Sequence, residues 1–142
     1  ESGTDKILKE AYDKGVIMSG NSAGGCVWFE YYDNDEDEDF DGTESTLTTK
    51  KALGFVKGYF CPHWNKKPEQ GIDKEATSKE VIKRMLTKES KFGYAVDEPA
   101  AIMVQTDEYR QVMTNIISKQ GANVYKLNQD IQNIRPDNKL QR

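Results

Sequence analysis

A serine flanked by glycines, in the stretch Gly20-Asn21-Ser22-Ala23-Gly24, is the feature that most constrains how this chain folds. The apolar run Val16-Ile17-Met18 leads into it, and Gly25-Cys26-Val27-Trp28-Phe29 follows without a proline. Strand, sharp turn and helix are the layout that projects a serine beyond the end of a sheet. Neighbours without a Cβ allow the backbone to turn that tightly. We therefore expect a nucleophile elbow over residues 16–30, with its helix running to about Tyr32.

The helix that follows this turn directs its first backbone amides toward the serine. An amide-rich helix N-terminus stabilises a developing negative charge, so Ala23 and Gly24 are the expected oxyanion donors. A glycine-rich turn between a strand and a helix, without any chemistry, gives the same local pattern.

His63 is the single histidine of the chain, in the segment Tyr59-Phe60-Cys61-Pro62-His63-Trp64-Asn65. It follows an apolar stretch that begins at Leu53 and precedes a polar loop, so we expect a strand over residues 53–65. Sheets with parallel strands build their sites at the carboxyl ends of those strands. If a histidine activates Ser22, it is His63, and nucleophilic catalysis is the leading hypothesis.

Three segments together resemble the serine peptidase family that includes aspartyl dipeptidase (peptidase E) and cyanophycinase. They are residues 20–30, residues 53–64 and Gly93-Tyr94-Ala95-Val96-Asp97-Glu98-Pro99-Ala100-Ala101, and they cover most of residues 15–105. The resemblance implies an α/β fold, a three-layer sandwich with a mostly parallel sheet, like that of class I glutamine amidotransferases. It also implies hydrolysis of short peptides, as by a dipeptidase, through a Ser–His–acid triad with no metal and no cofactor.

The acid of this triad has three candidates. The resemblance places it in the loop after the nucleophile helix, so Asp35 ranks first, followed by Glu30 and Glu98. The loop lies in an acidic tract, residues 33–44, with eight carboxylates in twelve residues. We expect a solvated loop there rather than a calcium site, because Thr48 stands where an EF-hand needs a bidentate glutamate.

Substrate contacts are expected from Asn21, Trp64, Lys74 and Lys79. Aspartyl dipeptidase grips its substrate's carboxylate with an arginine, and residues 75–79 contain none. A lysine supplies charge without the planar fork of a guanidinium, so a strict preference for N-terminal aspartate is not expected.

Composition excludes several other functions. The 142 residues carry a formal net charge of −4, and no basic stripe with interleaved aromatics indicates nucleic-acid binding. No apolar run approaches the roughly 18 residues that span a membrane, so we expect no membrane partner. Cys26 and Cys61 follow no metal-ligand spacing and are expected to be buried thiols, which favours the reducing cytoplasm.

The chain opens at Glu1 with an expected helix, capped by Thr4, with an apolar stripe from Ile7 to Tyr12 and an end at Gly15. The family places several strand–helix units before such a helix. We therefore expect residues 1–142 to form the C-terminal portion of one peptidase domain. Its expected partners are a short peptide substrate and either the N-terminal half of the same protein or a second copy.

The remaining elements are expected as follows. A helix begins at Ser78, and a C-terminal hairpin region covers residues 92–128. In that region 92–96 and 100–104 pair around Asp97-Glu98-Pro99. Tyr109, Val112, Met113, Ile116 and Ile117 show helical spacing, but the family resemblance implies a strand near 112–117 that leads to 124–127, and we expect the strand. The polar tail from Gln129 is expected to fray. Two alternatives to a peptidase stay open: a family member that binds peptides without catalysis, and an esterase with the α/β-hydrolase fold.

Overall fold

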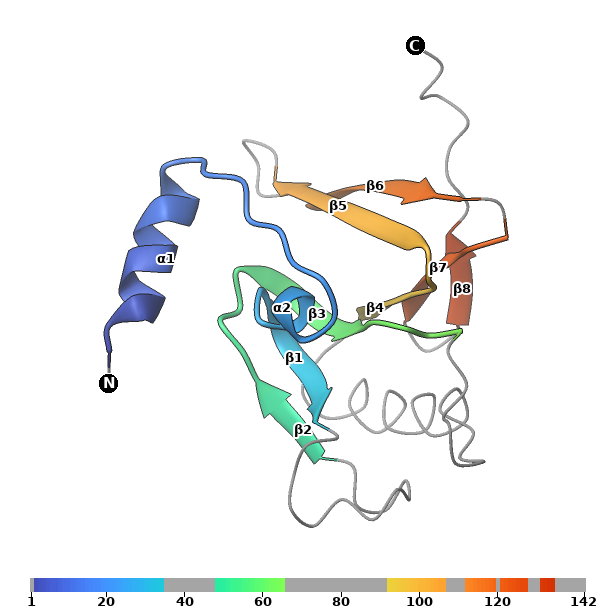
Figure 1. Ribbon diagram of the computed structural model, residues 1–142, viewed down its shortest axis with the longest axis horizontal. Helices are drawn as coiled ribbons and strands as arrows, with labels where there is room; N and C mark the ends of the chain where they lie inside the picture. The colour runs from blue at the N-terminus through green and yellow to red at the C-terminus, as the bar shows by residue number, and fades with distance from the viewer. Residues whose placement is uncertain are drawn as a thin grey trace.

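The computed structural model of the chain describes residues 2–34, 48–65, 92–106, 112–119, 121–127 and 131–134. Within these residues the elements are α1 (Thr4–Asp13), α2 (Ala23–Cys26), β1 (Phe29–Asn34), β2 (Thr48–Lys51), β3 (Val56–Cys61), β4 (Gly93–Val96), β5 (Ala100–Thr106), β6 (Val112–Ser118), β7 (Val124–Leu127) and β8 (Ile131–Ile134). Six strands form one sheet in the order β2-β1-β3-β4-β7-β8, and β5 with β6 forms a second sheet (Figure 1).

The centre of the large sheet is parallel and its flanks are antiparallel. β1 runs parallel to β3 and β3 runs parallel to β4, with Tyr32 opposite Phe60 and Cys61 opposite Ala95. β2 pairs antiparallel with β1, and β7 pairs antiparallel with both β4 and β8. The carboxyl ends of β1, β3 and β4 therefore meet at one edge, as expected for an α/β protein with a mixed central sheet.

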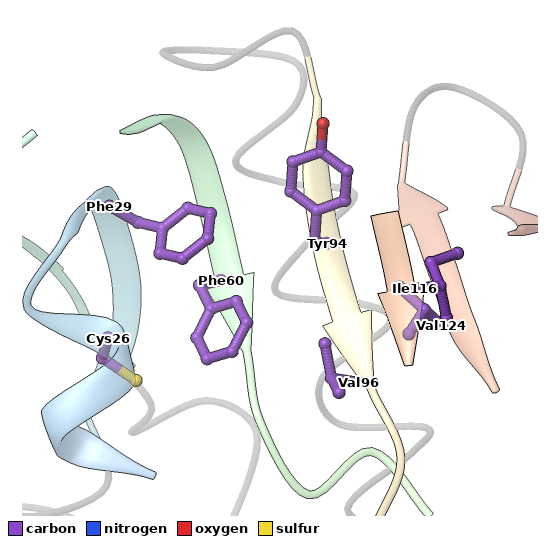
Figure 2. Close-up of a cluster of buried hydrophobic side chains, with 7 residues drawn as sticks. All are labelled: Cys26, Phe29, Phe60, Tyr94, Val96, Ile116 and Val124. Carbon is purple, nitrogen blue, oxygen red and sulfur yellow. The ribbon is translucent and has the colours of Figure 1, made fainter. Parts of the chain in front are cut away.

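Both faces of the central strands are buried. Tyr59, Cys61 and Ala95 lie in one cluster with Trp64 and Leu127, and Phe60, Tyr94 and Val96 lie in the other. Alternate residues of one strand point to opposite faces, so β3 and β4 supply both clusters at once. Figure 2 shows the second cluster, in which Cys26 of α2 and Ile116 of β6 meet residues of the large sheet. α2 and the β5–β6 pair therefore pack against the same face.

The helix expected to reach Tyr32 is wrong: α2 ends at Cys26, and Phe29 begins β1. The aromatic residues of this segment favour a pleated surface, and the Phe29 ring stacks on Phe60 with centroids 4.6 Å apart. Sheet packing therefore outweighs helix propensity here. Residues 16–18, expected as a strand, belong to no strand of the described chain.

The expected hairpin of 92–96 with 100–104 is also wrong, although both strands exist. β4 lies between β3 and β7, whereas β5 pairs with β6 from Ala100–Ser118 to Thr106–Val112. The strand expected near residues 112–117 and its successor at 124–127 are confirmed. The tail from Gln129 was expected to fray, but its residues Ile131–Ile134 form β8, which pairs antiparallel with β7 at the edge of the sheet.

The opening helix is confirmed, with a different start. Gly3, at φ 72°, is the residue before the first turn of α1, and no side chain caps that turn. No residue of α1 is buried, and Ile7 of its apolar stripe is 68% exposed. Tyr12 contacts the segment before β3: its ring is tilted against that of Phe55 with centroids 4.9 Å apart.

Several expectations fall outside the described residues. They concern Asp35 and most of the acidic tract, the helix after Ser78, and Lys74 and Lys79. Within the described part of the chain, neither helix has the length and apolar character needed to cross a membrane.

Candidate active site

Ser22 stands in a strained backbone conformation at the start of α2. Its φ of 53° and ψ of −128° are uncommon for a residue with a Cβ, and it occupies the position just before the helix. Its carbonyl accepts hydrogen bonds from the amides of Gly25 at 2.8 Å and Cys26 at 3.1 Å. This sharp turn into a helix agrees with the expected elbow, although the preceding segment is not a strand.

The glycine before Ser22 is required by the tightness of this turn. A Cβ on Gly20 would lie 1.8 Å from the carbonyl oxygen of Gly24, which no side chain can do without moving the backbone. Gly25 is also tightly packed, since a Cβ there would meet the Phe60 ring at 3.2 Å. By contrast, a Cβ on Gly24 would meet nothing within 4 Å. The first glycine of the pentapeptide is therefore a steric requirement and the last is not.

The two expected oxyanion donors differ in what their amides do. The Gly24 amide donates to the carbonyl of Asn21 at 2.9 Å, so the turn itself uses it. Among the described residues, no hydrogen bond engages the amide of Ala23. As the first residue of α2, Ala23 has no intrahelical acceptor for its amide, which leaves that amide able to bind a ligand.

His63 follows the end of β3 and also has a left-handed backbone, with φ 55°. Its side chain is 17% exposed, and its Nδ1 contacts Oε1 of Glu98. The two atoms are in direct contact, although not in hydrogen-bond geometry, and Nδ1 is shielded from solvent. The next residue, Trp64, donates its amide to the carbonyl of Val96 at 3.0 Å, which ties the histidine loop to the end of β4.

Comparison with known proteins identifies the family of the chain. The model of peptidase family S51 matches residues 1–112. The uncharacterized peptidase YgaJ of Bacillus subtilis (strain 168) is 33% identical over 127 residues, which are 89% of this chain and 48% of that protein. The chain belongs to peptidase family S51. The resemblance seen in the sequence is thereby confirmed.

The S51 chain spans about half of the length of this curated relative. No solved structure matches this S51 chain. Its assignment to a peptidase family therefore comes from sequence, and the roles of individual residues have to be argued from the geometry described above.

Of the three acids considered for this S51 chain, Glu98 contacts the histidine. Glu30 is engaged elsewhere: its Oε1 accepts from Lys57 Nζ at 2.7 Å and its Oε2 from the Gly58 amide at 2.9 Å. Burial is the largest influence on the Glu30 pKa and raises it, but the Lys57 and Gly58 hydrogen bonds and the charges of Lys57 and Lys51 hold it below its usual value. Asp35 lies outside the described residues.

Two further residues expected to contact substrate lie in different settings. Asn21 is exposed within the elbow. Trp64 is 4% exposed and packs in the core with Tyr59, Cys61, Ala95 and Leu127. The indole therefore anchors the histidine loop to the sheet.

Sequence reasoning missed two side chains beside the site. Asn65 donates from Nδ2 to the carbonyl of Glu98 at 2.8 Å and accepts the Glu98 amide on Oδ1 at 2.8 Å. Asp97, 4% exposed, accepts from the amide of Asn123 at 2.9 Å. The one signal in the sequence was position: each lies within two residues of a candidate already named.

Proposed function

We propose that this S51 chain carries the catalytic residues of a serine peptidase that hydrolyses short peptides. One observation supports this most strongly. Ser22 and His63 are the two residues other than glycine, within the described part of the chain, that have a positive φ. Backbone strain of this kind costs of order 1–3 kcal/mol and concentrates at functional sites. The strain thus falls on the serine and histidine that the sequence pattern had indicated.

In the proposed mechanism Ser22 Oγ attacks the peptide carbonyl while Nε2 of His63 accepts its proton. The same proton then passes to the leaving amine, and water repeats the sequence to release the acyl group. Glu98 is the proposed acid, because its carboxylate contacts Nδ1, the ring nitrogen that faces away from the serine in a triad. Its negative charge stabilises the imidazolium that forms.

The amide of Ala23 is the proposed oxyanion donor. It lies at the start of α2, directly after Ser22, and its hydrogen is not used within the described chain. Removing one oxyanion-hole donor from another serine peptidase, one that shares no ancestry with this family, lowers the rate by about 10²–10³. The elbow and the parallel β1-β3-β4 core also support a fold of the class I glutamine amidotransferase type.

Short peptides are the proposed substrate class, with no strict preference for an N-terminal aspartate, because residues 75–79 offer lysine but no arginine. We also propose the cytoplasm as the site of action, since Cys26 and Cys61 are buried thiols.

The test of this function compares two serines three positions apart. Ser22→Ala should abolish labelling by a fluorophosphonate probe and reduce dipeptide turnover by about 10³-fold or more, with the fold intact by circular dichroism. Ser19→Ala, which removes an exposed hydroxyl beside the elbow, is the matched control and should retain both.

Three outcomes separate the alternatives. Undiminished hydrolysis by Ser22→Ala contradicts the serine mechanism. A parent protein that binds peptides but takes no probe is a non-catalytic member of the family. Turnover of simple esters with none of dipeptides indicates an esterase.

A further inference from the structure

Asn65 bridges the loop that carries the proposed base to the residue that carries the proposed acid. We infer that Asn65 is a positioning residue, which holds the main chain of Glu98 so that its carboxylate stays against His63. This inference rests on the proposed function and adds a device that sets the geometry of the base–acid pair.

The bridge uses both ends of one primary amide. Nδ2 donates to the Glu98 carbonyl and Oδ1 accepts the Glu98 amide, each at 2.8 Å. A primary amide is the side-chain group that offers a donor and an acceptor side by side, so it can satisfy the N–H and C=O of one residue together. Alanine offers neither group, and aspartate offers the acceptor alone.

Three consecutive residues attach the two loops to each other. His63 contacts the Glu98 carboxylate, Trp64 donates its amide to the Val96 carbonyl at 3.0 Å, and Asn65 holds the Glu98 main chain. Trp64 is buried, so the residue between His63 and Asn65 is fixed in the core. The loop that supplies the base therefore also sets the position of the acid.

Such a device is needed because Glu98 is exposed. Its side chain is 51% accessible to solvent, against 17% for His63. A contact made by an exposed carboxylate contributes little by itself, since water competes for the carboxylate and ordering a long side chain costs entropy. Fixing the main chain of Glu98 removes part of that cost. The neighbour Asp97 is held on its other side by Asn123, whose amide and Nδ2 reach Asp97 Oδ2 at 2.9 and 3.2 Å.

The first experiment measures how Asn65 and Glu98 depend on each other. Asn65→Ala should lower kcat for dipeptide hydrolysis by about 10- to 100-fold with KM changed less than about threefold, because misplacing a catalytic group costs rate. Asn65→Asp, which keeps the acceptor for the Glu98 amide, should fall between Asn65→Ala and the parent. In a Glu98→Gln background, Asn65→Ala should cost less than about threefold, because the acid it positions is gone.

The second experiment detects the base–acid contact directly. A proton on Nδ1 that is held by a carboxylate gives a low-field NMR signal, which His63→Gln assigns by removing it. We expect the signal in the parent and its loss or broadening in Asn65→Ala, with far-ultraviolet circular dichroism unchanged.

The outcomes separate this inference from the proposed function. An equal loss from Asn65→Ala in the parent and Glu98→Gln backgrounds means a general structural role and overturns the inference. So does an unchanged kcat in Asn65→Ala when Glu98→Gln lowers activity. If Glu98→Gln is fully active while Ser22→Ala is inactive, Glu98 is not the acid, and both its role and that of Asn65 are wrong.

Discussion

At the scale of single residues, the elbow shows which of its glycines the turn requires. Gly20 is crowded by the Gly24 carbonyl, whereas Gly24 has open space where its own side chain would be. The two ends of the same pentapeptide are therefore subject to different physical constraints. Steric exclusion acts at the first glycine, and ordinary helix propensity acts at the second, because Gly24 lies within α2.

This contrast predicts opposite effects for one chemical change made four positions apart. Gly20→Ala should lower the free energy of unfolding by at least about 1–3 kcal/mol, as overpacking does, and should abolish probe labelling. Gly24→Ala should raise it slightly, by up to about 0.5–1 kcal/mol, because alanine favours a helix. Urea unfolding of the two variants beside the parent measures both. Equal destabilisation by the two substitutions would contradict the steric argument.

The sequence predicted Ser22 and His63 because each stands in a local pattern that can be recognised without knowing the fold. It left the acid open, because three carboxylates had similar claims and only the pairing of β3 with β4 brings Glu98 to His63. For Asn65 the one signal in the sequence was its position, two residues after His63. Its partner lies 33 positions away, and a lone asparagine carries no pattern of its own.

At the scale of elements, the parallel pair β1–β3 is joined by side chains as well as by its backbone. Glu30 of β1 reaches across to the side chain of Lys57 and the amide of Gly58 on β3. The stacking of Phe29 on Phe60 also joins the two strands, and this packing makes residues 29–34 a strand where a helix was expected. Local patterns indicated a strand over residues 53–65, of which β3 covers Val56–Cys61, and the family resemblance indicated the strands near 112–117 and at 124–127. Which strands pair depends on contacts distant in sequence, so the expected hairpin was wrong.

The Glu30 contacts predict how stability depends on pH. The folded pKa of this carboxyl lies below its ordinary value of 4.5, so ionised Glu30 contributes stability above about pH 4.5, and the contribution is lost as pH falls through the folded pKa. The difference in unfolding free energy between the parent and Glu30→Gln should therefore be largest near neutral pH and shrink below 4.5. Glu10→Gln, at an exposed position of α1, is the control. A difference that is independent of pH would contradict this prediction.

At the scale of the whole molecule, most of the exposed large apolar side chains of the described residues lie in two regions, the first 17 residues and the β5–β6 sheet, while Val27 is 38% exposed outside both. Ile7, Val16 and Ile17 are 68%, 53% and 91% exposed in the first 17 residues, and Met103 and Ile117 are 43% and 59% exposed on the β5–β6 sheet. Exposed apolar groups that gather in one region favour association. The first region is the more exposed of the two.

We therefore expect the 142-residue chain to self-associate through its first region. Exchanging Ile7 and Ile17 for lysine together should shift sedimentation toward the monomer at concentrations where the parent associates. The matched pair, Met103→Lys with Ile117→Lys, should leave the parent's distribution largely unchanged. A parent that sediments as a monomer throughout would show that these side chains do not drive association.

The parallel pairing of β3 with β4 has a consequence for the order of folding. Residues 62–92, 31 in all, separate the two strands along the chain, so their union requires closure of a long loop. Contacts of such range form slowly compared with local turns like the one at Ser22. During refolding the serine turn should therefore appear before the histidine meets its carboxylate. In a partly folded molecule Ser22 should be unreactive. Labelling by the fluorophosphonate probe should recover together with the last tertiary contacts of the sheet.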